Sequence, residues 1–260
     1  MAVTFISNSD VRNECAGIIG QVSTLVPDID LLIERTRKAA INDFERDCET
    51  YLQYRRVEMN PDPALVKGTD YDVEETPHDY VRMSSMKQLP QWIMRRRPIK
   101  WGTIPHIVIR PKPGTEFFTI PDDWIRADYY LGIIDLFPVT TMNVVFGAWP
   151  AFVMAVMDSS MPYATMPHFV SISYTAGWYD EETDTELPQE LDSVRDTVMG
   201  RIRWRLYQSL GDMIPNTQTL DGFTQNFDSV DQRMKRLEKA YNQFTTDWRA
   251  RYSPPAVSIV

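Results

Sequence analysis

Hydrophobic residues recur at helical spacing toward both ends of the chain, whereas its middle alternates short apolar runs with turn residues. From Pro27-Asp28 onward, apolar residues repeat every three or four positions with charged residues between them, which predicts an amphipathic helix. We expect this helix to end near Arg55-Arg56, because a proline-containing segment follows it. A shorter helix is predicted over Ser7–Gly20, with Ser9 or Asp10 as its cap.

Two further helices are predicted in the C-terminal part of the chain. The first begins at Pro188, since the first turn of a helix tolerates proline, and ends at Gly211. Asn216–Asp228 is predicted to be a polar connection, and the last helix spans Ser229–Arg251. Apolar residues of this last helix alternate four and three positions apart, a heptad-like seam that packs against another helix of the same chain or of a neighbouring subunit. The seam consists of Val230, Met234, Leu237, Tyr241, Phe244 and Trp248.

Leu89–Gly177 shows the pattern of an antiparallel β-region. Short β-branched and aromatic runs are separated there by Pro, Gly and Asp, which predicts about five to seven short strands. The prolines favour edge strands or strand ends, because proline cannot donate a hydrogen bond to a neighbouring strand. The acidic segment Thr69–Asp79, which contains no basic residue, is predicted to be a solvated loop.

The order of helices, β-region and helices predicts an α+β fold, in which a helical bundle from the N- and C-terminal helices carries a projecting antiparallel β-rich insert. The expected parts are residues 1–58 as the N-terminal helices of the bundle, 59–179 as the insert and 180–252 as the C-terminal helices. Residues 253–260 are expected to form an extended tail, because Pro254 and Pro255 exclude a helix there.

Charge limits the partners that this chain can bind. It has 36 acidic and 27 basic residues and a formal net charge of −9 at pH 7, which argues against non-specific binding of nucleic acid. An acidic surface would instead let DNA pass without adhering. One basic cluster, Arg95, Arg96 and Arg97, lies near Lys100 and Trp101. We predict that this cluster contacts an acidic surface of a neighbouring copy of the chain, with single-stranded nucleic acid as the alternative.

Catalytic, cofactor and metal motifs are absent from the sequence. The histidines His78, His106 and His168 belong to no GxSxG or HExxH pattern, and no glycine-rich phosphate loop occurs. Cys15 and Cys48 lack the spacing of a zinc site. We therefore expect no enzyme, no cofactor and no metal. No run approaches the ~18–20 apolar residues of a membrane span and no signal peptide is evident, so we expect synthesis in the cytosol.

The segment Val170–Ile214 resembles part of a known family. A strand-like run, Val170–Tyr174, leads into Thr175-Ala176-Gly177-Trp178, and an acidic loop then reaches Leu187-Pro188 and a long amphipathic helix. This order is similar to that of the head–tail adaptor (head-completion or connector) proteins of tailed bacteriophages. Other parts of the chain also resemble longer adaptors, namely Asp28–Ile33, Ala39–Cys48, Ile120–Trp124 and Gly132–Leu136.

The resemblance implies a structural, non-enzymatic virion protein made in the host cytoplasm. About twelve copies would form a homo-oligomeric ring in the neck, between the portal protein and tail or other neck proteins, with DNA as a passing cargo and no membrane partner. It also implies that the last helix and the tail face the portal, through Met234, Leu237, Tyr241, Phe244, Trp248 and Ile259. From the charge pattern we add the expected subunit interface, which consists of Arg95, Arg96 and Arg97.

Two other functions remain open on the sequence alone. A tail terminator, another ring-forming neck or tail protein, would be mainly β and would lack two long terminal helices. A small hydrolase or metal-binding enzyme would need a cluster of polar side chains in a pocket, and the sequence offers no pattern for one.

Overall fold

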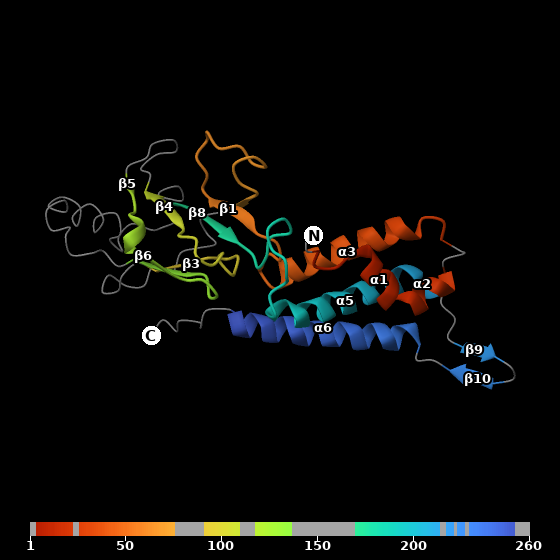
Figure 1. The fold of residues 1–260 in the computed structure, drawn as a ribbon. Coiled ribbons are helices and arrows are strands. Elements are labelled where there is room, and N and C mark those ends of the chain that lie inside the picture. Colours follow the sequence, from red (N-terminus) through yellow and green to blue (C-terminus); the bar gives the residue numbers. More distant parts are fainter. Residues whose placement is uncertain are drawn as a thin grey trace. The chain divides into compact units, whose positions relative to one another are not determined.

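The computed structural model describes residues 4–22, 26–75, 91–109, 118–136, 170–213, 217–220, 223–226 and 229–252, and it has a mixed α+β fold (Figure 1). The chain divides into two compact units. The helical unit comprises residues 1–48 and 179–251, and the β-rich unit comprises residues 49–178 and 252–260. We had expected the first division at residues 58–59, whereas the structure places it at residues 48–49.

The helical unit contains α1 (Asn8–Glu14), α2 (Ala16–Val22), α3 (Ile29–Asp47), α5 (Glu190–Leu210) and α6 (Val230–Tyr252), with a 3-10 turn at Gly211–Met213 after α5. α3, α5 and α6 run side by side (Figure 1). The apolar face of α5 is buried, because it packs against its neighbours along its whole length; it consists of Leu191, Val194, Val198, Met199, Ile202, Leu206 and Leu210. The predicted C-terminal helices agree with α5 and α6 except at their ends.

The predicted helix over Ser7–Gly20 is two helices, which are divided at Cys15. Ser7 caps α1: its hydroxyl accepts the backbone N–H of Asp10, and the Asp10 carboxylate accepts the N–H of Ser7. This reciprocal pair satisfies two N–H groups at the start of the helix. The expected caps, Ser9 and Asp10, were wrong because Ser7 also suits this role and the apolar pattern does not separate the three positions.

α3 ends well before the predicted Arg55-Arg56. Cys48 closes the last helical hydrogen bonds, and Glu49 follows in the left-handed region with φ 50°, a conformation that ends helices. The prediction was wrong because Leu52 continues the helical spacing of apolar residues although it lies beyond the helix. Leu52 is buried all the same, so the apolar pattern reports its burial and not its backbone conformation.

The β-rich unit contains two described sheets. One has the strand order β2-β1-β8-β4-β5, with a parallel β1–β2 pair and antiparallel pairs elsewhere, and the other is antiparallel with the order β3-β7-β6. The strands are β1 (Arg55–Met59), β2 (Val73–Glu75), β3 (Gln91–Ile93), β4 (His106–Ile109), β5 (Phe118–Thr119), β6 (Ile125–Asp128), β7 (Ile133–Leu136) and β8 (Val170–Ala176), with a 3-10 turn at Asp122–Trp124.

The strands β3 to β8 lie in the predicted β-region, whereas β1 and β2 lie outside it. β2 belongs to the segment Thr69–Asp79, which was wrongly predicted to be a loop throughout: Glu75 is buried there, and the strand pairs with β1. The predicted polar connection Asn216–Asp228 was also wrong, because β9 (Thr217–Leu220) and β10 (Phe223–Asn226) form an antiparallel hairpin in it. Asp221-Gly222, between these strands, is a typical hairpin signal that the prediction overlooked.

β8 lies between β1 and β4 at the centre of the five-stranded sheet. Its Ile172 and Ala176 are fully buried in an apolar core to which both sheets contribute. Gly177 follows β8 with φ 137°, and a Cβ atom there would lie 2.5 Å from the backbone oxygen of Gln53. Glycine is therefore required at this position, since the two chain segments pass too closely for a side chain.

Candidate functional site

α6 packs its apolar seam onto helices of its own unit. The ring of Trp248 meets that of Phe44 in α3 edge-on, with centroids 5.8 Å apart, and the ring of Phe244 lies 6.4 Å from Phe44. Tyr241 donates its hydroxyl to the Asp47 carboxylate at 3.0 Å. Tyr241 and Trp248 are buried, whereas the rest of the expected portal-facing set is half-buried, namely Met234, Leu237 and Phe244.

The sequence left two partners open for the seam, a helix of the same chain or one of a neighbouring subunit. The described contacts are with helices of the same chain. Ile259, the last member of the expected portal-facing set, lies outside the described residues. Portal contact through the seam stays a prediction. The surface of α6 that a partner can reach more readily is its outer face, which consists of Lys235, Arg236, Glu238, Lys239, Asn242, Gln243 and Thr246.

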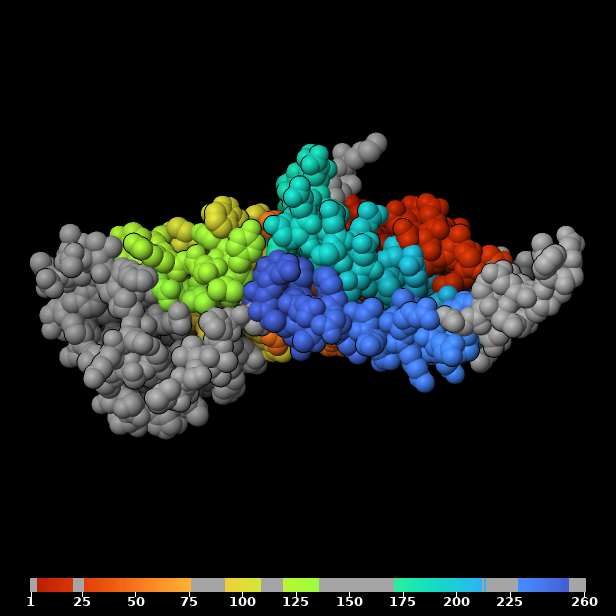
Figure 2. Space-filling view, turned by 90° about the horizontal axis from the view of Figure 1, so that it is seen from below, coloured from red at the N-terminus to blue at the C-terminus, as the bar shows by residue number. Residues whose placement is uncertain are grey.

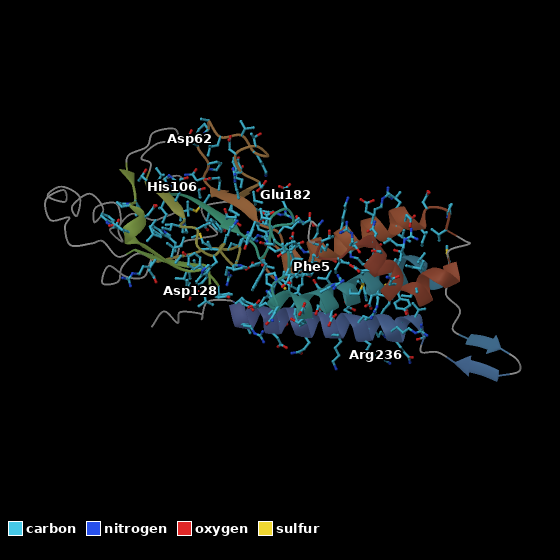
Figure 3. All side chains as sticks on the ribbon, in the orientation of Figure 1. Phe5, Asp62, His106, Asp128, Glu182 and Arg236 are labelled. Atoms are coloured by element: carbon cyan, nitrogen blue, oxygen red, sulfur yellow. The ribbon has the colours of Figure 1, made fainter. Side chains whose placement is uncertain are left out.

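The outer face of α6 is polar and exposed. It forms one side of the helical unit in Figure 2, and Figure 3 shows Arg236 pointing away from the other helices. A shallow hollow runs along it between Lys235 and Thr246. α6 has six basic and three acidic residues, so it is a basic helix in a chain with a net charge of −9.

A buried carboxylate joins α3 to α5. Oδ2 of Asp43, a residue only 4% exposed, accepts hydrogen bonds from Arg201 Nε at 3.0 Å and from Arg205 Nε and Nη2 at 3.0 and 2.6 Å. Burial acts to raise the pKa of Asp43, but the hydrogen bonds from Arg205 and Arg201 outweigh it and hold that pKa below its usual value. Asp43 is therefore ionised at neutral pH and holds both arginines.

The Asp43 network extends to α6 through Arg201. The guanidinium carbon of Arg201 lies 4.3 Å from the ring centroid of Trp204 and 4.8 Å from that of Tyr241, which are cation–π distances. Burial and the neighbouring Asp47 raise the pKa of Tyr241, so its phenol stays protonated and donates to Asp47. α3, α5 and α6 thus meet in one connected polar network.

The expected subunit interface lies just after β3 and consists of Arg95, Arg96 and Arg97. All three side chains form ion pairs with acidic residues of their own unit. Arg95 and Arg97 approach Glu49 at 3.8 and 3.7 Å, and Arg96 approaches Glu75 at 3.7 Å. The side chain of Arg95 is 43% exposed, compared with 18% for Arg96 and 12% for Arg97. The structure therefore brings the three together but leaves mainly Arg95 to a neighbouring subunit, and that contact stays a prediction.

Arg96 belongs to a compact group around Tyr51. The guanidinium carbons of Arg96 and Arg55 lie 4.8 and 4.7 Å from the centroid of the Tyr51 ring. Glu75, the acid near Arg96, also accepts the hydroxyl of buried Tyr174 at 3.1 Å. Burial, followed by the charge of Glu75, raises the pKa of Tyr174, so this hydroxyl remains a donor. The group ties β2 to β8 and serves the fold.

Sequence reasoning singled out Trp101 only as a neighbour of the basic cluster. It missed the exposed group of rings that we call the aromatic platform, which consists of Trp101, Tyr129 and Tyr130. Trp101 is 72% exposed and Tyr130 is 47% exposed. The ring centroid of Trp101 lies 4.8 Å from that of Tyr129 and 6.4 Å from that of Tyr130. Lys100, beside the platform, holds its ammonium 4.4 Å from the centroid of the Tyr54 ring. Exposed Trp and Tyr side chains are typical of binding surfaces.

Among the residues that the structure describes, no group of three or more His, Cys, Asp or Glu could hold a metal ion. His106 is exposed on β4, and His78 and His168 lie outside the described residues. Within the same described ranges, no helix is both long and apolar enough to span a membrane.

The chain matches no known protein-family model and no functionally characterised protein to which it was compared.

Proposed function

We propose that this chain is a structural, non-enzymatic head–tail adaptor of a tailed bacteriophage. In this proposal it is a virion neck protein, and about twelve copies form a ring between portal and tail through which DNA passes. The helical unit would be the bundle of the family, made from both ends of the chain, and the β-rich unit would be the insert that projects from it.

The observation that carries the proposal is the construction of the helical unit. α3 from the N-terminal part meets α5 and α6 from the C-terminal part in the Asp43 network. The stretch that carries the resemblance, Tyr174 to Trp178, leads directly into this unit at Tyr179. Helices from the two chain ends, with a β-region between them in sequence, are what the resemblance to longer adaptors implies.

The portal contact would use the outer face of α6. The seam residues are engaged with α3 and α5, so they offer a partner only the half-buried edges of Met234, Leu237 and Phe244. The outer face is exposed and contains Lys235 and Lys239, so it supports binding to an acidic surface. Arg95, the most exposed of its cluster, would contact the next subunit of the ring.

The test mixes the full chain with the portal protein encoded in the same phage genome and measures assembly by native mass spectrometry and electron microscopy. We expect a ring that binds the portal end to end. Lys239→Glu should weaken this binding about fivefold per site, because one exposed charge pair contributes up to ~1 kcal/mol. Lys67→Glu, a matched reversal at an exposed position of the β-rich unit, should leave binding unchanged.

Two results would count against the proposal at different levels. If the chain neither forms rings nor binds the portal, the adaptor function is wrong. If it does both and Lys239→Glu behaves as Lys67→Glu does, the adaptor function stands and the outer face of α6 is not the portal contact.

A further inference from the structure

The exposed apolar side chains of the β-rich unit gather at two places. Of the seven large apolar side chains that are exposed in the described part of the chain, five belong to this unit. Leu65 and Val66 lie next to each other in the connection between β1 and β2, and we call them the apolar tip. The other three are Trp101 and Tyr130 of the aromatic platform and Ile104, which follows Trp101 in sequence. Single exposed apolar residues are common, whereas groups of them are typical of interaction surfaces.

The apolar tip is held by hydrogen bonds of its own backbone. The N–H of Val66 donates to Oδ2 of Asp70 at 2.8 Å, and the Val66 carbonyl accepts the N–H of Asp70 at 2.9 Å. The N–H of Leu65 donates to the Asp62 carbonyl at 2.9 Å. Tyr71, which follows Asp70, is buried and anchors this end of the connection. The tip is therefore ordered before any partner arrives, which lowers the entropy that binding costs.

The aromatic platform is held in the same way. Thr103 donates its N–H to the Lys100 carbonyl at 3.2 Å, which closes the turn that carries Trp101. Ile99 donates its N–H to the Tyr129 carbonyl at 2.8 Å, so this turn is joined to the turn between β6 and β7, which carries both tyrosines. The two turns thus present their rings as one surface.

The tip and the platform lie on opposite sides of β1 and β8. The tip belongs to the connection from β1 to β2, which is the strand at one edge of the sheet. Ala176 of β8 pairs with Arg55 of β1 on one side and bridges to Ile99, at the start of the platform turn, on the other. Figure 3 labels Asp62, near the tip, and Asp128, next to Tyr129, on opposite sides of the β-rich unit. One copy can therefore offer the two surfaces to two different neighbours.

The charges beside the two surfaces are of opposite sign. The Asp70 carboxylate lies at the tip, since it accepts the N–H of Val66, and Lys100 lies in the platform turn. Neither Asp70 nor Lys100 forms an ion pair within the described ranges. The other charges nearby, Lys67 at the tip and Asp128 at the platform, also differ in sign. Exposed charge pairs add little affinity, but they favour one orientation of the partner.

We propose that the apolar tip of one copy docks on the aromatic platform of a second copy. Leu65 and Val66 cover the exposed rings of Trp101 and Tyr130, and Asp70 approaches Lys100. Because the two surfaces differ, the contact is heterologous and leads to closed rings or open chains of subunits. Two aliphatic side chains bury little area, so a single contact is weak and forms at high protein concentration.

Sedimentation velocity of the full chain over a concentration series tests this proposal. We expect the natural chain to form pairs and longer species as its concentration rises. Trp101→Ala and the double variant Leu65→Ser/Val66→Ser should each weaken this association at least about tenfold, because each removes one side of the contact. Trp101→Phe keeps an aromatic ring at this position and should weaken it less.

Mixing the two disabled proteins shows whether the tip and the platform bind each other. Trp101→Ala retains the tip, and Leu65→Ser/Val66→Ser retains the platform. An equimolar mixture should form pairs that contain one copy of each, because a single heterologous contact is restored, and it should form no longer species. Native mass spectrometry identifies these pairs, since the two proteins differ in mass.

The matched control is Leu31→Ser. Leu31 is 44% exposed on α3 of the helical unit, so this variant removes a similar side chain from another surface and should associate as the natural chain does. Circular dichroism checks that each variant is folded. A natural chain that stays monomeric, or disabled variants that associate as it does, would overturn the proposal. Loss of association in both variants without recovery in the mixture would show that another surface occupies the platform, and the assignment to the tip would be wrong.

The adaptor function does not enter this argument. Self-association is measured without the portal protein, so its absence would leave portal binding to its own test. Conversely, a chain that does not bind the portal could still associate through the tip and the platform.

Discussion

α5 and α6 are helices of 21 and 23 residues in the same unit, and both carry several basic side chains, but they use them in opposite ways. On α5, Arg195 pairs with Asp10 at 3.1 Å, Arg203 pairs with Glu14, and Arg201 and Arg205 share Asp43. On α6, Lys235 and Lys239 lie on the exposed outer face.

This difference separates charges that hold the fold from charges that are available to a partner. An ion pair formed with a buried carboxylate loses little to solvent screening, whereas an exposed charge on α6 contributes almost nothing to folding. Arg201 and Arg205 of α5 therefore contribute to the stability of the helical unit, whereas Lys235 and Lys239 of α6 lie exposed where a partner can reach them. The comparison can be tested by removing charges from each side.

The largest effect is expected for Asp43→Ala. It leaves Arg201 and Arg205 in a largely buried position without their carboxylate, which should lower the free energy of unfolding by about 3 kcal/mol. Urea denaturation followed by circular dichroism measures this. Asp231→Ala, at an exposed position of α6, is the matched control and should change stability by less than ~0.5 kcal/mol. Equal effects of the two variants would show that the Asp43 network does not hold the helices.

A smaller effect is expected from pH. The pKa of Asp43 is lower in the folded chain than in the unfolded chain, so its contribution is complete above the unfolded value of about 3.9 and is lost as the pH falls through the folded value. The natural chain should therefore lose stability steeply below about pH 4, and Asp43→Ala should show a shallower loss. Parallel stability curves for the two proteins between pH 5 and pH 2.5 would contradict this assignment.

The smallest effect is expected for the double variant Lys235→Ala/Lys239→Ala on the outer face of α6. Both side chains are exposed and alanine favours helix, so stability should change by no more than ~0.5 kcal/mol. The same denaturation experiment measures it. A loss comparable to that of Asp43→Ala would mean that these lysines hold the fold, and the distinction between the two helices would fail.

The helices that were predicted best are those whose apolar residues repeat over many turns. α5 and α6 satisfy this, so their existence and most of their extent follow from spacing alone. β1 was missed because Leu52 continues the spacing of α3 after the helix has ended at Asp47. Local pattern cannot distinguish a buried residue in a helix from a buried residue just beyond it.

The candidate sites were less predictable, because they depend on contacts between distant residues. Arg201 is separated from its partner Asp43 by 158 positions, and no local signal connects the two. Trp92 and Trp101 flank the same basic cluster, but Trp92 is 2% exposed and Trp101 is 72% exposed. Their sequence surroundings do not reveal this difference, since it arises from Trp92 lying in strand β3 with its side chain in the apolar core and Trp101 lying in a turn.

The structural reason for Gly177 limits what the resemblance to head–tail adaptors can show about function. It is the glycine of the Thr-Ala-Gly-Trp stretch, and it is fixed by the close passage of the Gln53 backbone rather than by any surface that a partner could reach. A protein that shares this stretch is therefore expected to share the close passage of two chain segments after β8, which is a property of the fold. Evidence for or against the proposed role in a virion should be sought on α6 and around Trp101, where side chains are exposed.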